Sequence, residues 1–176
     1  MKRSLTLLFI LLFSFTMLSG CKKDYNKEAQ RFGKEFIKKI YSFKDTDKII
    51  DHESMMNMAM SIMESLKPLM TEKAYKNYIA SREVLIPMTI AFENKCTIEV
   101  DNIELKETIK EKDKNIYYYD YNLSLRLIPL KENEESKNFK QSGSIYIYRD
   151  EKGYKIDTLL INYNDKEWLK LLYDEK

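Results

Sequence analysis

The first half of the chain repeats apolar residues at the three- and four-residue spacing of amphipathic helices. The repeat begins at Glu28, with lysine and glutamate between the apolar positions. Those positions are Ala29, Phe32, Phe36, Ile40 and Phe43. Asp45-Thr46-Asp47 interrupts the repeat and offers N-caps for a second helix, which we expect to run to about Leu66.

Two prolines then divide the remaining helical region. Pro68 favours a break, after which Thr71 can cap a third helix through Tyr78. Pro87 predicts a bend or a new short element within residues 84–92. The sequence before residue 94 therefore predicts helices only.

After Asn94 the apolar positions recur every second residue, as they do in strands. The phase reverses between Val100 and Ile103, which predicts a β-bulge at Asp101-Asn102. A second strand is expected to bury one face and expose the other. The buried positions would be Tyr117, Tyr119, Tyr121, Leu123, Leu125 and Leu127, and the opposite positions are Tyr118, Asp120, Asn122, Ser124 and Arg126.

The rest of the chain predicts a loop, a hairpin and a helical tail. The polar run 131–140 is expected to be the loop, and segments 143–149 and 154–163 form the hairpin, with Gly153 in its turn. Residues 165–173 have helical character, with Trp168 and Leu172 on one side. This order of elements predicts the α+β class, with N-terminal helices packed against a curved antiparallel sheet of about four strands.

The first 24 residues follow a different pattern. A basic Lys2-Arg3 start precedes 14 mostly apolar residues (5–18), then Ser19-Gly20, Cys21 and charged residues. As a helix this apolar run is about 21 Å long at ~1.5 Å per residue, short of a bilayer core of ~30 Å. The pattern resembles the lipobox of bacterial lipoproteins. That resemblance implies cleavage before Cys21 and a diacylglycerol on its thiol, which supplies the two acyl chains of a stable anchor.

An ordinary secretory signal with a chance cysteine and an uncleaved anchor are the alternatives. We expect residues 1–20 to be a cleaved lipoprotein signal peptide, 21–27 a lipid-anchored tether and 28–176 a single α+β domain. The expected location is the outer, extracytoplasmic face of the cell membrane.

The composition of the chain argues against a nucleic-acid partner and against a disulfide. Cleavage removes Lys2 and Arg3, which leaves 28 basic and 28 acidic residues, so no basic field favours nucleic acid. With Cys21 acylated, Cys96 is the one remaining thiol and no intramolecular disulfide can form. The wealth of Lys, Ile, Asn and Tyr is typical of an AT-rich genome. A Gram-positive source is expected, with a Bacteroidetes-like source as the alternative.

Two segments also carry a resemblance at the level of the fold. Residues 69–75 (LMTEKAY) and 98–105 (IEVDNIEL) resemble small Firmicute lipoproteins of the nuclear transport factor 2-like superfamily. The resemblance implies a cone in which helices close a curved sheet over an apolar pocket. The superfamily includes isomerases, dehydratases and many non-catalytic binding domains, so the fold alone predicts no activity.

A cluster of methionines next to the only histidine is the clearest candidate for a metal-binding site. Met55, Met56, Met58, Met60 and Met63 fall within nine positions. Soft thioethers and an imidazole could bind Cu(I), with His52, Met55 and Met56 as the ligands. The simpler interpretation is that these methionines fill irregular core space or line an adaptable groove. A Cys96/His52 catalytic pair is formally possible, but Cys96 lies in an apolar alternation typical of a buried cysteine.

Tyrosine is also abundant, with 13 residues. The inward Tyr117, Tyr119 and Tyr121, together with Met56 and Met63, are candidates for the walls of a pocket, and outward Tyr118 suits a protein interface. We therefore expect a non-catalytic, membrane-anchored domain that binds an apolar small molecule or a partner protein, without a cofactor. An extracytoplasmic Cu(I)-handling protein is the alternative, and a small isomerase- or dehydratase-like enzyme comes third.

Overall fold

The computed structural model describes residues 24–109 and 115–162. The expected signal peptide, Cys21 and the expected C-terminal helix lie outside these residues. In chain order the elements are α2 (Tyr25–Tyr41), the 3-10 turn η1 (Thr46–Lys48), α3 (His52–Leu66), η2 (Lys67–Leu69), α4 (Glu72–Ser81), α5 (Leu85–Glu93), β1 (Cys96–Ile109), β2 (Ile116–Pro129), β3 (Lys137–Asp150) and β4 (Gly153–Ile161). Among the described residues, no helix is long and apolar enough to cross a membrane.

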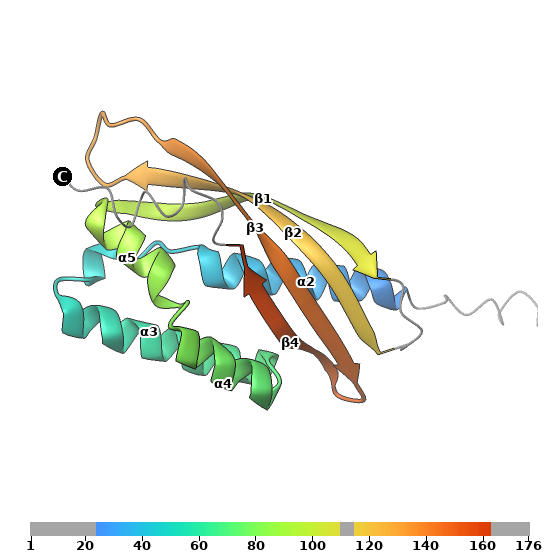
Figure 1. Cartoon of the computed structure of the whole chain (residues 1–176). Coiled ribbons are helices and arrows are strands. Elements are labelled where there is room, and N and C mark those ends of the chain that lie inside the picture. The colour runs from blue at the N-terminus through green and yellow to red at the C-terminus, as the bar shows by residue number, and fades with distance from the viewer. Residues whose placement is uncertain (1–23, 110–114, 163–176) are drawn as a thin grey trace, which may run out of the picture.

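The four strands form one antiparallel sheet in the order β1-β2-β3-β4. Figure 1 shows α2 running along the sheet, with α3 and α5 near one end and the N-terminus of α2 at the other. The α+β class, with N-terminal helices packed on a curved sheet of four strands, is therefore confirmed.

Local capping chemistry explains where most helices begin. The carboxylate of Asp51 accepts the backbone N–H of Ser54 at 2.8 Å in a capping box, and Thr71 Oγ1 accepts the N–H of Ala74 at 3.2 Å. The break at Pro68, the cap at Thr71 and the short element at Pro87, which is α5, are confirmed.

The expected cap at Asp45-Thr46-Asp47 is wrong. These residues lead into η1, and Thr46 is buried with its hydroxyl donating to the carbonyl of Cys96 at 2.6 Å. The side chain that sequence reasoning assigned to a cap therefore satisfies a buried backbone acceptor 50 positions away.

The predicted bulge in the first strand is confirmed. The pairing of β1 with β2 shifts between Val100 and Asn102, which leaves Asp101 as the extra residue. A second shift lies between Glu107 and Ile109. Such bulges increase the local bend and twist of a strand, which allows this sheet to curve around α2.

The expected loop 131–140 is too long, because β3 already begins at Lys137. Residues 137–140 pair with β2, and Phe139 lies opposite Leu125. Strand pairing uses backbone hydrogen bonds and leaves alternate side chains in solvent, so polar residues in this segment do not prevent it.

The core lies between α2 and the inward face of the sheet. Phe36 and Ile37 of α2 are buried, as are Leu125 and Ile145 of the sheet. Helix α2 approaches the sheet closely at Gly33, where an added Cβ would lie 2.8 Å from the side chain of Ile147. This close approach leaves little space between helix and sheet.

Candidate functional site

Tyrosine side chains occupy the centre of the cone. The hydroxyls of Tyr41 and Tyr121 share a hydrogen bond at 3.3 Å, and Tyr121 also donates to the carbonyl of Leu160 at 3.3 Å. The ring of Tyr121 fits because its cross-strand partner is Gly143. A Cβ at Gly143 would lie closer than 3.0 Å to both the Tyr121 hydroxyl and the Leu160 carbonyl oxygen.

The space left beside these tyrosines is very small. A cavity of about 10 Å³ is lined by Ile40, Tyr41, Tyr78, Glu83, Ile86, Pro87 and Ile161. About one water fits such a volume, whereas small-molecule pockets measure ~300–1,000 Å³. As bounded by the described residues, this cavity cannot hold an apolar ligand.

Burial also keeps the central phenols protonated. It raises the pKa of Tyr121 to about 12, and the pKa of the buried Tyr41 lies well above its ordinary value, through burial first and the neighbouring Tyr121 second. Neither phenol is therefore poised to act as a base at neutral pH.

The other inward tyrosines hold the first turn of α2. Tyr119 donates from its hydroxyl to the side-chain oxygen of Asn26, whose amide donates to Glu107 of β1 at 3.1 Å. Tyr154 donates to the carbonyl of Tyr25 at 3.1 Å and to the carboxylate of Glu28 at 3.2 Å. The predicted inward face of β2 is correct. The hydroxyls of Tyr119 and Tyr154, however, form hydrogen bonds with residues of α2 and do not line an open pocket.

Tyr117 belongs to the same group, because it is partly buried and its ring packs edge-on against Tyr154 at 6.2 Å between centroids. The sequence carried no signal for these partners. Asn26 and Tyr119, for example, are 93 positions apart.

The methionines of α3 divide between core and surface. Met55 is buried, with the hydroxyl of Thr89 lying 3.9 Å from its sulfur, and Met63 packs partly buried against the core. Met56 is half-buried, whereas Met60 is 58% exposed.

His52 is exposed at the first position of α3. Within the described part of the chain, no group of three or more His, Cys, Asp or Glu side chains could hold a metal ion. Thioethers are a different ligand class, so Cu(I) binding through His52, Met55 and Met56 stays a prediction.

Cys96 is a buried structural residue. Its side chain lies at 2% exposure, and burial raises the pKa of its thiol to about 11. A thiol with this pKa is protonated at neutral pH and is a poor nucleophile. The interpretation of Cys96 as a small buried hydrophobic residue is confirmed.

The outer face of the sheet is polar and hollowed. One hollow of about 400 Å³ is lined by Asn102, Glu104, Asn122, Leu123, Ser124, Lys140, Gln141 and Ser142. A second of about 530 Å³ is lined by Lys106, Asp120, Tyr121, Asn122, Ser142, Gly143, Ser144, Leu160, Ile161 and Asn162. Within the second, Ser144 donates to Asp120 at 2.7 Å.

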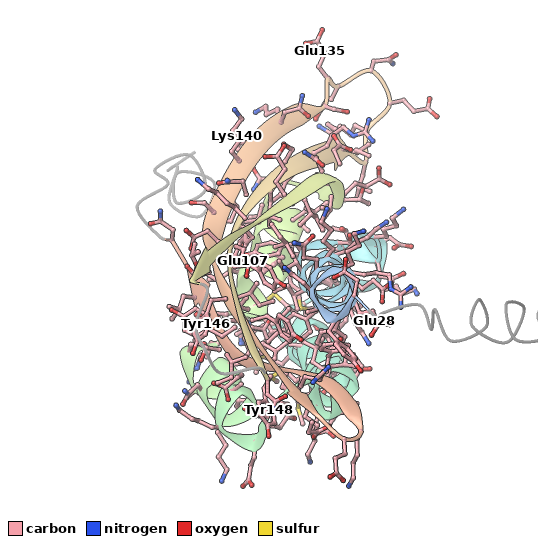
Figure 2. All side chains as sticks on the ribbon, turned by 90° about the vertical axis from the view of Figure 1, so that its right-hand side faces the viewer. Glu28, Glu107, Glu135, Lys140, Tyr146 and Tyr148 are labelled. Atoms are coloured by element: carbon pink, nitrogen blue, oxygen red, sulfur yellow. The ribbon has the colours of Figure 1, made fainter. Side chains whose placement is uncertain are left out.

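Aromatic and apolar side chains lie on the same face, where the Tyr118–Tyr146 pair follows the Asp120–Ser144 pair along the strands and Leu160 lines the second hollow. The rings of Tyr118 and Tyr146 pack edge to face with centroids 4.8 Å apart, and Leu160 is 51% exposed. Figure 2 shows Tyr146 at the side of the molecule, away from Glu28 on α2.

An ion-pair cluster stands at the bulge of the same sheet. Arg126 contacts Glu99 at 3.0 Å and Asp101 at 3.2 Å, and Lys44 contacts Glu99 at 2.9 Å. Lys44, and after it Arg126, holds the pKa of Glu99 below its ordinary value. The cluster joins the segment before η1 to the bulged strand, which is a structural role.

Comparison with known proteins relates this chain to solved structures alone. No protein-family model matches it, and no curated protein sequence matches it significantly. A periplasmic fragment of TraM is 13% identical with a TM-score of 0.50, covering 77% of this chain and 96% of that one.

An IcmL-like type IV secretion system protein from Legionella pneumophila is 10% identical with a TM-score of 0.50, covering 77% and 90% of the two chains. CagV, a VirB8 homolog of the type IV secretion system of Helicobacter pylori, is 12% identical with a TM-score of 0.48, covering 73% and 91%. At these identities the first two structures show the fold alone, which is consistent with the nuclear transport factor 2-like fold expected from the sequence.

Proposed function

We propose that this chain is a lipid-anchored extracytoplasmic protein whose domain is non-catalytic and binds a partner protein on the outer face of its sheet. One contrast carries the proposal. The centre of the cone is filled by Tyr41 and Tyr121 to a residual cavity of about 10 Å³, whereas hollows of about 400 and 530 Å³ lie on the outer face. A partner protein therefore suits the domain better than an apolar small molecule.

The size of the outer face supports a macromolecular partner. β2 and β3 have 14 residues each, and such strands extend about 45 Å at ~3.3 Å per residue. Four strands spaced by ~4.8 Å span about 15–20 Å, so the face offers on the order of 700 Å². That area is close to the ~800 Å² that each partner contributes to a standard interface.

The chemistry of this face also suits a protein interface. Its hollows present amide, hydroxyl, carboxylate and ammonium groups, and the Tyr118–Tyr146 pair supplies aromatic surface. Polar groups around aromatic anchors are typical of wet, non-obligate interfaces.

Two observations support the extracytoplasmic location. The sequence from Lys2 to Cys21 resembles a lipoprotein signal. The fold is shared with a fragment of TraM that is described as periplasmic, and with an IcmL-like protein of a type IV secretion system.

The absence of a catalytic role is supported by the state of the buried groups. Tyr41, Tyr121 and Cys96 are held protonated by burial. Asp120 and Arg126 lie on the outer face, and Arg126 is paired with Glu99 and Asp101.

Photo-crosslinking in cells that produce the full chain tests this proposal. A photoreactive amino acid in place of Asn122, on the outer face, should crosslink to a second polypeptide. The same group in place of exposed Lys73 on α4 should not. Ser144→Arg places a bulky cation in the larger hollow and should abolish the crosslink, whereas Asn77→Arg on α4 should leave it unchanged.

Two results would contradict the proposal. One is equal crosslinking from positions 122 and 73. The other is an apolar small molecule that stays bound to the purified protein in native mass spectrometry, and that is lost when a larger side chain is substituted at the wall of the cavity inside the cone.

A further inference from the structure

One end of the molecule gathers the start of α2 and the turn between β3 and β4. Figure 1 shows both at the end opposite the β2–β3 loop, and Figure 2 looks onto this end. Tyr154 of β4 joins them by donating to the carbonyl of Tyr25. Asn115, just before β2, accepts the backbone N–H of Arg149 at 2.8 Å.

This end contains a wide hollow of about 940 Å³. It is lined by Tyr25, Glu28, Asn115, Tyr148, Arg149, Asp150, Glu151, Lys152, Gly153, Tyr154 and Lys155. The guanidinium of Arg149 lies 3.8 Å from the centre of the Tyr25 ring and donates to the side chain of Asn115 at 3.3 Å. Arg149 is therefore held in place by stacking and by a hydrogen bond.

The hollow has three cations and three carboxylates, but their surroundings differ. The carboxylate of Asp150 accepts the N–H groups of Lys152 and Gly153 at 2.7 and 3.0 Å, and Glu28 accepts the hydroxyl of Tyr154. Arg149, Lys152 and Lys155 form no ion pair with any other described residue. Lys152 and Lys155 are thus available to an outside phosphate, and Arg149 is held at the same surface by Tyr25 and Asn115. Two of the carboxylates accept hydrogen bonds from within the domain.

The position of this end along the chain supplies the second argument. Only four residue steps separate Cys21 from Tyr25, the first residue of α2, and four extended residues reach about 14 Å at most. An anchor at Cys21 therefore holds this end close to the bilayer surface. Tyr25 and Tyr148 are 43% and 37% exposed here, and tyrosine favours the boundary between membrane and water.

We infer that this end is the membrane-facing surface of the domain, and that Arg149, Lys152 and Lys155 contact the phosphates of phospholipid headgroups. The inference rests on the proposed lipid anchor at Cys21. It also explains how the outer sheet face stays accessible, because the strands run away from the membrane towards the β2–β3 loop.

Headgroup quenching on vesicles tests the orientation. The lipidated full chain is reconstituted in phosphatidylglycerol–phosphatidylethanolamine vesicles that carry a nitroxide on a headgroup. One protein carries a fluorophore at Glu151→Cys in the β3–β4 turn, and another carries it at Glu135→Cys in the opposite loop. Cys96 is buried and does not compete for the label. We expect at least fivefold stronger quenching at position 151.

Two matched double variants test the cations. Lys152→Gln/Lys155→Gln should lower the quenching at position 151 by at least twofold. Lys137→Gln/Lys140→Gln makes the same change in charge on the far half of β3 and should leave it unchanged. Equal quenching at positions 151 and 135, or equal effects of the two pairs, would overturn the inference.

Co-sedimentation separates this inference from the anchor on which it rests. A chain that sediments with the vesicles but shows equal quenching at both reporters keeps the anchor and loses the orientation. Cys21→Ser is the control and should stay in the supernatant. A wild-type chain that also stays in the supernatant would refute the anchor, and the orientation with it.

Discussion

Tyrosine hydroxyls do two kinds of work in this domain. The hydroxyls of Tyr41 and Tyr121 form a hydrogen bond with each other in the middle of the core. Their rings fill the space that a ligand would occupy in an open cone. Tyr119 and Tyr154 reach the first turn of α2 and fix the end of the helix that follows the proposed anchor. A phenol can do both because its ring is apolar and its tip is polar.

At the residue scale, Gly143→Ala should lower the free energy of unfolding by ~1–3 kcal/mol, as overpacking of a filled core does. The added methyl group would meet the Leu160 carbonyl and the Tyr121 ring, and the carbonyl belongs to the backbone and cannot turn away. Urea denaturation measures the change. Ser142→Ala, on the partly exposed outer face next to it, should stay within ~0.5 kcal/mol. A tolerated Gly143→Ala would mean that the cone has free space.

The raised pKa values of Tyr41 and Tyr121 predict a loss of stability at alkaline pH. The folded state keeps these protons above the ordinary tyrosine pKa of ~10, where the unfolded chain loses them. Their contribution is therefore complete below about pH 10. The part that comes from Tyr121 disappears as the pH rises towards 12, and Tyr41 adds a further loss in the same direction. Denaturation curves between pH 8 and pH 11 measure this decline, and Tyr41→Phe/Tyr121→Phe should make it shallower. A decline that the double variant leaves unchanged would assign it to other groups.

At the scale of elements, α3 separates the two interpretations of the methionines. Met55 is 8% exposed and Met60 is 58% exposed on the same helix, so they form a matched pair. Met55→Ala should lower the free energy of unfolding by ~2–5 kcal/mol, because it leaves a cavity, whereas Met60→Ala should change it by less than ~0.5 kcal/mol.

Thermal unfolding with and without Cu(I) completes this test. For a core helix, the melting temperature of the wild type should not respond to Cu(I). A rise that disappears in His52→Ala, or in Met56→Ala, would instead support metal handling, because a ligand that binds the folded state stabilises it by mass action.

The elements were predictable where a local signal decides them. Capping by Thr71, the break at Pro68 and the phase reversal around Asp101 all depend on neighbours within a few residues, and the structure contains all three. The loop prediction for 131–140 failed because strand pairing at Lys137 depends on backbone groups of β2.

The candidate site was less predictable, for a physical reason. The alternation in β2 predicts that the strand face with Tyr119 and Tyr121 is buried, and the structure confirms that both side chains are buried. It does not show whether the rings enclose a cavity or fill one. That depends on Gly143 and Tyr41, which lie 22 and 80 positions away from Tyr121 and become neighbours only in the folded chain.

At the scale of the whole molecule, the proposals place three functions in three separate regions. The tyrosine-filled core provides stability, the end with Arg149 and Lys152 faces the membrane, and the outer sheet face with Asn122 and Ser144 meets the partner. The strands connect these regions, since β2 and β3 run from the far loop to the membrane-facing end (Figure 1).

This arrangement depends on Cys21, so its modification is the decisive whole-molecule prediction. Mass spectrometry of protein extracted from native membranes should show a mature chain that starts at Cys21 and carries a diacylglycerol on the thiol. Cys21→Ser removes the acceptor thiol, and the domain should then be recovered folded in the soluble fraction. Because the core does not include Cys21, urea denaturation of this variant should match that of the domain released from the anchor by proteolysis. An unmodified soluble wild-type chain that behaves like Cys21→Ser would refute the anchor, and the filled cone and the outer face would then belong to a secreted domain.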